Sequence, residues 1–283
     1  MSIPDYLVVG TVTRDLIAGG GYRIGGTATY SAVTARALGC RVAVLTSAGD
    51  DLPLADLFDG IDLRVIPAPQ TTTFENIYYD GRRRQYVRAV AAHLTPADVP
   101  PEWRRARIAH LGPLVQEIGP EMVDVFPAET LVGVTPQGWL RAWDATGLVR
   151  NQPWSSAPRI LARADAMVLS PEDVGGDSAQ LAQYVGLARL AAVTHSWQGA
   201  TLYHQGRQVT YPAYHVSEID PTGAGDVFAA AFFIRLAETG DPPEAARFAN
   251  AAASFAVEGE GISTIASRSA VEERLRNGIL RRS

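Results

Sequence analysis

Residues Asp220–Phe228 read DPTGAGDVF, a glycine-rich turn that runs directly into a long apolar helix predicted over Ala224–Glu238. Gly223 and Gly225 allow the backbone to approach a ligand closely. The free N–H groups of the first helical turn point toward that ligand, and the helix dipole adds positive potential there. The segment therefore predicts an anion-binding site at a helix N-terminus.

Asp226 stands inside this predicted anion site. Its carboxylate has two roles open to it. It can cap the helix N-terminus, or it can accept the proton of a hydroxyl that attacks a phosphoryl group while the N–H groups take up the developing charge. A cap needs no small residues on both sides, whereas a phosphate that approaches the backbone does. The flanking glycines therefore favour the catalytic role.

Outward from this segment, short apolar strands alternate with helical segments, which favours a mostly parallel sheet with helices on both faces. The predicted strands of this core are Tyr6–Gly10, Val42–Ser47, Ile61–Ile66, Arg107–Leu111, Thr130–Val134, Ala166–Leu169, Leu190–Thr194, and the hairpin Thr201–His204 with Gln208–Tyr211. The other predicted helices are Thr27–Leu38, Glu121–Phe126, Pro136–Ala145, Ser156–Ala164, Ser178–Gly186, Pro243–Glu258 and Ser269–Asn277. The pattern predicts an α/β protein built as one αβα sandwich.

A second hairpin interrupts this alternation. Phe74–Tyr79 and Arg84–Val90 read as strands joined by the turn signal Asp80-Gly81. A short excursion strand is also expected near the glycines that precede Thr27. We therefore predict a single domain over residues 1–283 with a small β lid, whose strands come from about residues 11–25 and 71–90. The stretch between Asp50 and Thr71 is expected to hold only a trimmed helix.

Composition excludes several classes of function. The 283 residues carry a net charge of −5, without a basic stripe, which argues against binding to nucleic acid or to a membrane surface. All 25 cationic Lys and Arg positions are Arg, so a lysine-dependent P-loop or Schiff base is impossible. The lone Cys40 forms no internal disulfide. The purest apolar run, Val227–Ile234, is too short to span a bilayer, and a cytoplasmic location is expected.

The segment DPTGAGDVF resembles the C-terminal signature of the ribokinase/PfkB family of carbohydrate kinases. Further segments resemble the family in the same order along the chain, from about Tyr6 to Thr264. They are Gly10 with Asp15, Gly25–Ala32 (GGTATYSA), Val193-Thr194 with Gly199-Ala200, and Asn250–Ala253 (NAAA). The resemblance implies an αβα core under a β lid. It also implies transfer of the γ-phosphoryl group of ATP to a hydroxyl of a sugar, polyol or nucleoside.

The resemblance also implies a role for each matching residue. Asp226 is implied as general base, with Gly223, Ala224 and Gly225 as the anion hole. The acceptor-binding candidates are Asp15, Gly25, Gly26, Tyr30 and, from the lid, Asn76. Tyr30 stands where sugar kinases often carry Asn, so it is either a core residue or a ring that stacks on the acceptor. A polyol such as myo-inositol fits the double-glycine variant at Gly25-Gly26 best.

On the nucleotide side, the matching candidates are Thr194, Ser196, Gly199 and Asn250. Asn250 is equally well explained as a buried hydrogen-bonding residue. The family's Asn-x-x-Glu motif is replaced here by Ser170-Pro171-Glu172-Asp173. Ser170 and Asp173 are the expected partners of the phosphates and of Mg²⁺, with Asp173 acting on the metal through water.

Three further expectations concern partners and alternatives. The resemblance implies that lids of two subunits can pair into a homodimer, and it leaves open a monovalent cation near Asp220. A dinucleotide dehydrogenase is disfavoured because Gly19–Gly26 lacks the Gly-x-Gly-x-x-Gly spacing. A non-catalytic small-molecule-binding relative stays open because of the altered Ser170–Asp173 segment.

Overall fold

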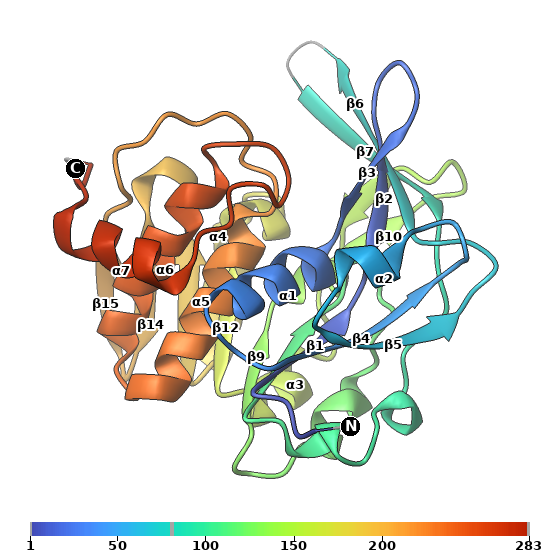
Figure 1. Cartoon of the computed structure of the whole chain (residues 1–283). Helices are drawn as coiled ribbons and strands as arrows, with labels where there is room; N and C mark the ends of the chain where they lie inside the picture. Colours follow the sequence, from blue (N-terminus) through green and yellow to red (C-terminus); the bar gives the residue numbers. More distant parts are fainter. Residues whose placement is uncertain (1, 80–81, 282–283) are drawn as a thin grey trace.

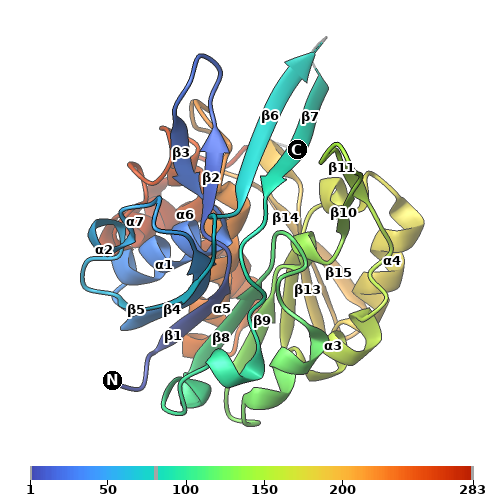
Figure 2. The same cartoon turned by 90° about the vertical axis from the view of Figure 1, so that its right-hand side faces the viewer.

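The computed structural model describes residues 2–79 and 82–281. The Asp80-Gly81 turn of the predicted hairpin lies outside the described residues. The strands of the central sheet have the order β15-β14-β13-β12-β9-β8-β1-β4-β5 (Figures 1 and 2). They are β1 (Tyr6–Gly10), β4 (Val42–Ala48), β5 (Asp62–Pro67), β8 (Ile108–Gly112), β9 (Leu131–Val134), β12 (Ala166–Leu169), β13 (Leu190–Thr194), β14 (Ala200–His204) and β15 (Arg207–Tyr211). Strand β14 pairs antiparallel with both β13 and β15, and the other neighbours pair in parallel.

Helices cover both faces of this sheet, as Figure 2 shows. One face carries α1 (Thr27–Ala37), α5 (Ala224–Thr239), α6 (Pro242–Ala256) and α7 (Arg268–Asn277), and the other carries α3 (Ala157–Arg163) and α4 (Ser178–Leu187). The short helix α2 (Leu54–Leu57) is the trimmed helix expected in that region. Six 3₁₀ turns complete the described part: η1 (Pro96–Asp98), η2 (Trp103–Arg105), η3 (Pro120–Val125), η4 (Pro136–Gly138), η5 (Pro171–Val174) and η6 (Ser196–Gln198).

The two helical layers follow from the unbroken apolar runs of the strands. Along β1, Tyr6 and Val8 face the core beneath α1, α5 and α6, whereas Leu7 and Val9 face the core beneath α3 and α4. A strand buried on both faces reads as a continuous hydrophobic run, because successive side chains point to opposite sides. The predicted α/β class, an αβα sandwich with a mostly parallel sheet, is therefore confirmed.

A second sheet projects above the core (Figure 1). Its order is β3-β2-β6-β7, with β2 (Thr13–Leu16), β3 (Tyr22–Gly25), β6 (Thr73–Tyr79) and β7 (Arg82–Ala89). Strand β2 pairs antiparallel with β3 and parallel with β6. This pairing joins two segments far apart in sequence, and it sets Asp15 opposite Phe74.

The helix predicted over Pro136–Ala145 is wrong. The chain forms only the 3₁₀ turn η4 there, and then enters a two-stranded antiparallel ribbon of β10 (Arg141–Trp143) and β11 (Val149–Asn151). The ring of Trp139 stacks on Trp154 at 5.0 Å between centroids, and its indole N–H donates to the Ile118 carbonyl at 2.6 Å. These distant partners outweigh local helical spacing. The segment predicted as a helix over Glu121–Phe126 is likewise a 3₁₀ turn, η3.

Among the described residues, no helix is both long enough and apolar enough to cross a lipid bilayer.

The packing of β9 against α5 can be tested with a glycine pair. A methyl group at Gly133 would lie 2.6 Å from the ring of Phe233, inside the core. We expect Gly133→Ala to lower the free energy of unfolding by about 1–3 kcal/mol through overpacking. Urea unfolding at equilibrium measures this change.

The matched control is Gly186→Ala in α4, where an added methyl group meets no atom within 4 Å. Alanine there is expected to raise stability by about 1 kcal/mol, because it has the higher helix propensity. Equal effects of the two substitutions would contradict the packing described here.

Candidate active site

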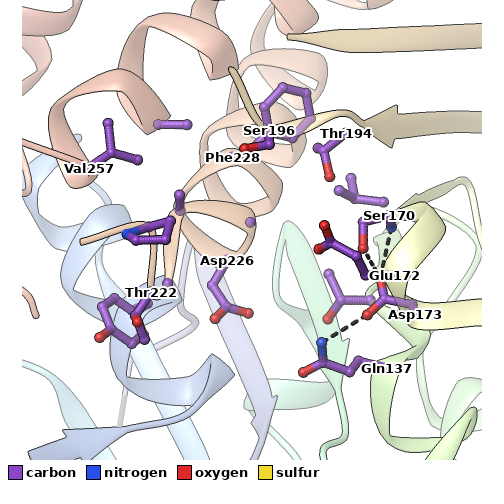
Figure 3. Close-up of a pocket in the computed structure, with 18 of the residues that line it drawn as sticks. Gln137, Ser170, Glu172, Asp173, Thr194, Ser196, Thr222, Asp226, Phe228 and Val257 are labelled. Atoms are coloured by element: carbon purple, nitrogen blue, oxygen red, sulfur yellow. Dashed lines mark hydrogen bonds between the residues drawn. The ribbon is translucent and has the colours of Figure 1, made fainter. Parts of the chain in front are cut away.

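A cleft of about 790 Å³ opens at the C-terminal ends of the parallel strands. Its walls come from the segments that follow β9, β12 and β13, from the lid strands β2 and β6, and from the start of α5. Ligands of open α/β sheets bind at this edge. Figure 3 shows the interior, with Asp226 on one side and Gln137, Glu172 and Asp173 on the other.

The turn before α5 is built around Gly223, which has a left-handed backbone with φ of 82°. A Cβ atom there would lie 2.3 Å from the ring of Tyr30, so only glycine fits. The first i→i−4 bond of the helix runs from the Val227 N–H to the Gly223 carbonyl at 2.9 Å. The N–H groups of Gly225 and Asp226 lie ahead of that bond, where a helix has no internal acceptor for them. The Ala224 N–H instead donates to the Pro221 carbonyl at 3.2 Å.

Asp226 does not cap the helix. It is the third residue of α5, and no side chain caps this N-terminus. Its carboxylate points into the cleft (Figure 3). Burial raises its pKa from 3.8 to about 6, and the neighbouring charges of Asp173 and Asp15 add to this effect. A hydrogen bond with Thr27 and the charge of Arg141 oppose the rise in pKa. A partly buried carboxyl with a raised pKa is suited to accept a proton near neutral pH.

The lid side of the cleft collects most of the expected acceptor-binding residues. Asp15, Gly26, Tyr30 and Asn76 line it. The Asp15 carboxylate accepts from the Thr13 hydroxyl at 3.0 Å, and the Asn76 side-chain oxygen accepts from Gln85 at 3.1 Å.

The double glycine has a steric reason. Gly25 is not part of the lining but lies against Asp15, where a Cβ atom would meet a carboxylate oxygen at 2.3 Å. Gly26 has φ of 91°, and its Cβ would meet the Thr11 carbonyl oxygen at 2.3 Å. The pair therefore makes room for Asp15 and for the close approach of the β1–β2 connection.

Tyr30 is a buried residue that also borders the cleft. It is only 4% exposed, yet it lines the cleft and packs directly beneath Gly223. Burial raises the pKa of its phenol well above the usual range, so the hydroxyl stays protonated. The ring therefore packs against the glycine turn that precedes α5.

The opposite wall carries the expected nucleotide-side residues. Thr194, Ser196, Gly199 and Asn250 all line the cleft. Ser196 has φ of 52°, a left-handed conformation that glycine adopts more readily, and Gly199 has φ of 98°. Asn250 is 6% exposed, and its amide nitrogen donates to the carbonyls of Tyr211 at 3.0 Å and Pro212 at 3.3 Å.

Ser170 and Asp173 form a capping box around η5. One carboxylate oxygen of Asp173 accepts from the Ser170 N–H at 2.7 Å and from its hydroxyl at 3.0 Å. The other oxygen accepts from the Gln137 amide at 2.8 Å. Glu172 is exposed and borders the cleft beside Asp173.

These donors suit an outer-sphere role toward Mg²⁺. Among the described residues, no cluster of three or more His, Cys, Asp or Glu side chains could hold a metal by itself. Mg²⁺ usually keeps several waters and takes one or two carboxylates together with substrate phosphates. Glu172 and Asp173 on one wall of the cleft fit that pattern.

Sequence reasoning missed several residues of the cleft. Gln137 and Arg141 were hidden in the segment wrongly predicted to be a helix, although its Pro136-Gln137-Gly138 start was a usable turn signal. Phe74 and Gln85 come from the lid, and their place in the cleft depends on the β2–β6 pairing. Arg281 arrives from the C-terminal end, with no local signal in the sequence.

Asp220, near which a monovalent cation was considered, pairs with an arginine of the lid. The Arg23 guanidinium lies 3.3 Å from an Asp220 oxygen and 2.8 Å from Glu260. The other Asp220 oxygen accepts from the Thr222 N–H at 2.9 Å, which shapes the turn before Gly223. Lid strand β3 is thereby tied to the loop that leads into α5.

The fold is that of the ribokinase-like kinases. A pyrophosphate-dependent kinase in the ribokinase family, solved with a pyrophosphate analog and myo-inositol, superposes with a TM-score of 0.77 at 20% identity, over 94% of this chain and 99% of that one. Residues 164–268 match the model of the pfkB family carbohydrate kinases.

Curated relatives extend this likeness to most of the chain. A cytidine kinase of Thermococcus kodakarensis is 27% identical over 247 residues, which are 81% of this chain and 87% of the relative. An inositol 3-kinase of Oryza sativa subsp. japonica is 28% identical over 91% of this chain and 69% of the relative. The chain is thus similar to the pfkB family carbohydrate kinases over residues 164–268, a stretch that includes the signature at Asp220–Phe228.

Substitution of Asn250 tests its two interpretations, a buried hydrogen-bonding residue and a nucleotide contact. Its amide satisfies two backbone carbonyls beside β15, so we expect Asn250→Ala to lower the free energy of unfolding by about 1–3 kcal/mol. Denaturant unfolding measures the loss. Gln183→Ala, at an exposed position of α4, is the control and should change stability little. Unchanged stability together with weakened ATP binding would instead assign Asn250 to nucleotide recognition alone.

Proposed function

We propose that the protein transfers the γ-phosphoryl group of ATP to a hydroxyl of a sugar, polyol or nucleoside, with Asp226 as general base. One observation carries this proposal. The Asp226 carboxyl opens into the cleft from the first turn of α5, with burial raising its pKa to about 6. A proton acceptor thus lies beside a helix N-terminus that suits an anion.

The reaction follows from this arrangement. The acceptor hydroxyl gives its proton to Asp226 as its oxygen forms a bond to the γ-phosphorus. The bond between that phosphorus and the β–γ bridging oxygen breaks, and ADP departs with the bond's electrons. The N–H groups of Gly225 and Asp226 donate to the phosphoryl oxygens, which carry the charge of the transition state.

The donor lies along the wall formed by Thr194, Ser196, Gly199 and Asn250, with its phosphates toward Gly223. Ala253 and Val257 add an apolar patch to that wall, as a nucleobase requires. Mg²⁺ bound to the phosphates would be held through water by Asp173 and Glu172, and it would neutralise phosphate charge.

The acceptor lies under the lid, between Asp15 and Asp226. Asp15 and Asn76 offer oxygen and amide groups for hydroxyls, and Tyr30 closes the floor. The curated relatives include a cytidine kinase and an inositol 3-kinase, so both nucleosides and cyclic polyols belong in an acceptor screen. We infer a polyol such as myo-inositol as the first acceptor to test.

A screen of acceptors against two donors tests the proposal. ATP and pyrophosphate are each offered with myo-inositol, ribose, fructose and cytidine, and phosphorylated product is measured. Pyrophosphate is included because one structural neighbour depends on it. A protein that binds these compounds without turnover would support the non-catalytic alternative.

The catalytic role of Asp226 predicts a defined pH dependence. Only the ionised carboxylate accepts a proton, so kcat/KM should rise with pH through about 6 and level off above it. Below that value the rate should fall about tenfold per pH unit. Asp226→Asn should reduce kcat by at least about 10²–10⁴-fold, while ATP binding measured by calorimetry persists. A variant with wild-type turnover would refute the assignment.

Asp226 should also lower the free energy of unfolding at a pH above its raised pKa. Its folded pKa is raised, so the neutral form is favoured in the fold, and stability is lost as pH rises from 3.8 to about 6. Asparagine avoids that loss, and Asp226→Asn should be about 1–3 kcal/mol more stable than wild type at pH 8. The difference should vanish near pH 4, which unfolding curves at both pH values can check.

The fit of Asp15 against Gly25 predicts a selective effect on the acceptor. Gly25→Ala pushes a methyl group into the Asp15 carboxylate, so the acceptor KM should rise roughly 10- to 100-fold with little change in the KM for ATP. Initial rates with either substrate varied measure both constants. Gly186→Ala, remote from the cleft, is the control. Equal loss for both substrates would indicate general disorder of the site instead.

A further inference from the structure

The cleft is poor in positive charge for a site that binds phosphates. Six carboxylates line it, and two arginines, Arg141 and Arg281, are the cationic side chains in its described lining. The carboxylates belong to Asp15, Glu172, Asp173, Glu218, Asp220 and Asp226. His195 also lines the cleft, but partial burial lowers its pKa and so disfavours its charged form. Each of the two arginines is therefore a candidate to bind the negatively charged phosphoryl group during its transfer.

Arg281 belongs to the nucleobase end of the cleft. Its guanidinium donates to the carbonyls of Tyr214 at 3.3 Å and Val216 at 3.4 Å, and lies 5.8 Å from the centre of the Trp197 ring. These contacts hold it beside the 3₁₀ turn that follows β13. Arg281 is not among the main causes of the shift in the Asp226 pKa.

Arg141 lies at the reacting end. Its guanidinium is 5.6 Å from the centre of the Phe74 ring, and Phe74 stands opposite Asp15 in the lid sheet. Arg141 is also the positive charge among the main causes that set the pKa of Asp226. It therefore lies near both the lid-side acceptor wall and the catalytic base.

The backbone of Arg141 is fixed on both sides. It pairs with Asn151 in the β10–β11 ribbon, and its carbonyl accepts a hydrogen bond from the Gln116 side chain. Trp139, two residues earlier, is anchored by its stack on Trp154. A charged group on a rigid ribbon costs little reorganisation when charge develops beside it.

We propose that Arg141 is a further catalytic residue, whose guanidinium binds the oxygens of the phosphoryl group in transit across from the N–H groups at the start of α5. This inference rests on the proposed function. No covalent bond to arginine forms: its N–H groups donate to phosphoryl oxygens while the group passes from ADP to the acceptor. The planar fork of a guanidinium matches this geometry, whereas an ammonium group acts as a point charge.

The experiment compares Arg141→Gln and Arg141→Lys with the control Arg150→Gln. Arg150 lies on the partner strand of the same ribbon, is 65% exposed and pairs with Asp144 at 3.2 Å. We expect Arg141→Gln to reduce kcat about 10²–10³-fold with acceptor KM changed less than about threefold, and the lysine variant to recover only part of that loss. Arg150→Gln should match the wild type. A kcat of Arg141→Gln within about threefold of wild type would overturn the inference.

The pH profile gives a readout that a merely structural role would not produce. Arg141 lowers the pKa of Asp226, so its removal should move the acid limb of kcat/KM to higher pH. The limb should stay in place for Arg150→Gln. An acid limb that does not move in Arg141→Gln would count against the inference.

Arg141 could bind phosphate oxygens of a second kind, namely those of an acceptor that already carries a phosphate. Rates are therefore measured with myo-inositol and with ribose 1-phosphate. A loss in kcat with neutral myo-inositol supports contact with the phosphoryl group in transit. A loss confined to the KM for ribose 1-phosphate would instead assign Arg141 to the acceptor and overturn the inference.

A binding experiment tests the role of Arg141 independently of the proposed function. If the wild type turns over no donor and acceptor pair, the proposed function fails, and thermal unfolding with pyrophosphate still tests Arg141. Pyrophosphate should raise the melting temperature of the wild type and of Arg150→Gln, and raise that of Arg141→Gln clearly less. Equal shifts in all three proteins, or no shift in the wild type, would overturn the role of Arg141 in binding phosphoryl groups.

Discussion

The burial of helix α5 is the constraint on which the site depends. Residues Val227–Ile234 are at most 2% exposed and pack between the sheet and the neighbouring helices α1 and α6. Each large apolar side chain removed from water contributes about 1.5–3 kcal/mol. This packing fixes the helix axis, so the first turn stays at the mouth of the cleft. There its N–H groups lack internal acceptors, which alone would be unfavourable.

The same packing offsets the cost of an ionised carboxylate in the first turn. A pKa raised from 3.8 to about 6 corresponds to about 3 kcal/mol against the charged form of Asp226. That cost is comparable to the burial of one phenylalanine, and α5 buries Phe228, Phe232 and Phe233. The helix therefore has enough stabilising contact to hold a reactive group in an unfavourable environment. Thr27 and Arg141 adjust how unfavourable that environment is.

The parts of the fold that could be predicted are those whose stability is local or whose burial is uniform. Tyr6–Gly10 is apolar throughout because both faces of β1 are covered, so its pattern identifies a strand without knowledge of its neighbours. Arg141–Trp143 is different, because it pairs with Val149–Asn151 and depends on the stack of Trp139 on Trp154. Those contacts leave no strand-like alternation in the segment itself. Its local spacing is instead typical of a helix, which made the prediction wrong.

The residues of the candidate site also fall into those that a local motif predicts and those that depend on distant contacts. Gly223 and Asp226 were predictable because one short segment specifies both the turn and the helix start. Arg141 was not, because it meets Asp226 only through the folding of a separate ribbon. A contiguous motif therefore indicates the reaction class, whereas the proposed acceptor wall consists of side chains brought together by sheet register. Since one residue of slip would turn Asn76 to the other lid face, the side chains of that wall are set by strand pairing that a sequence pattern does not reveal.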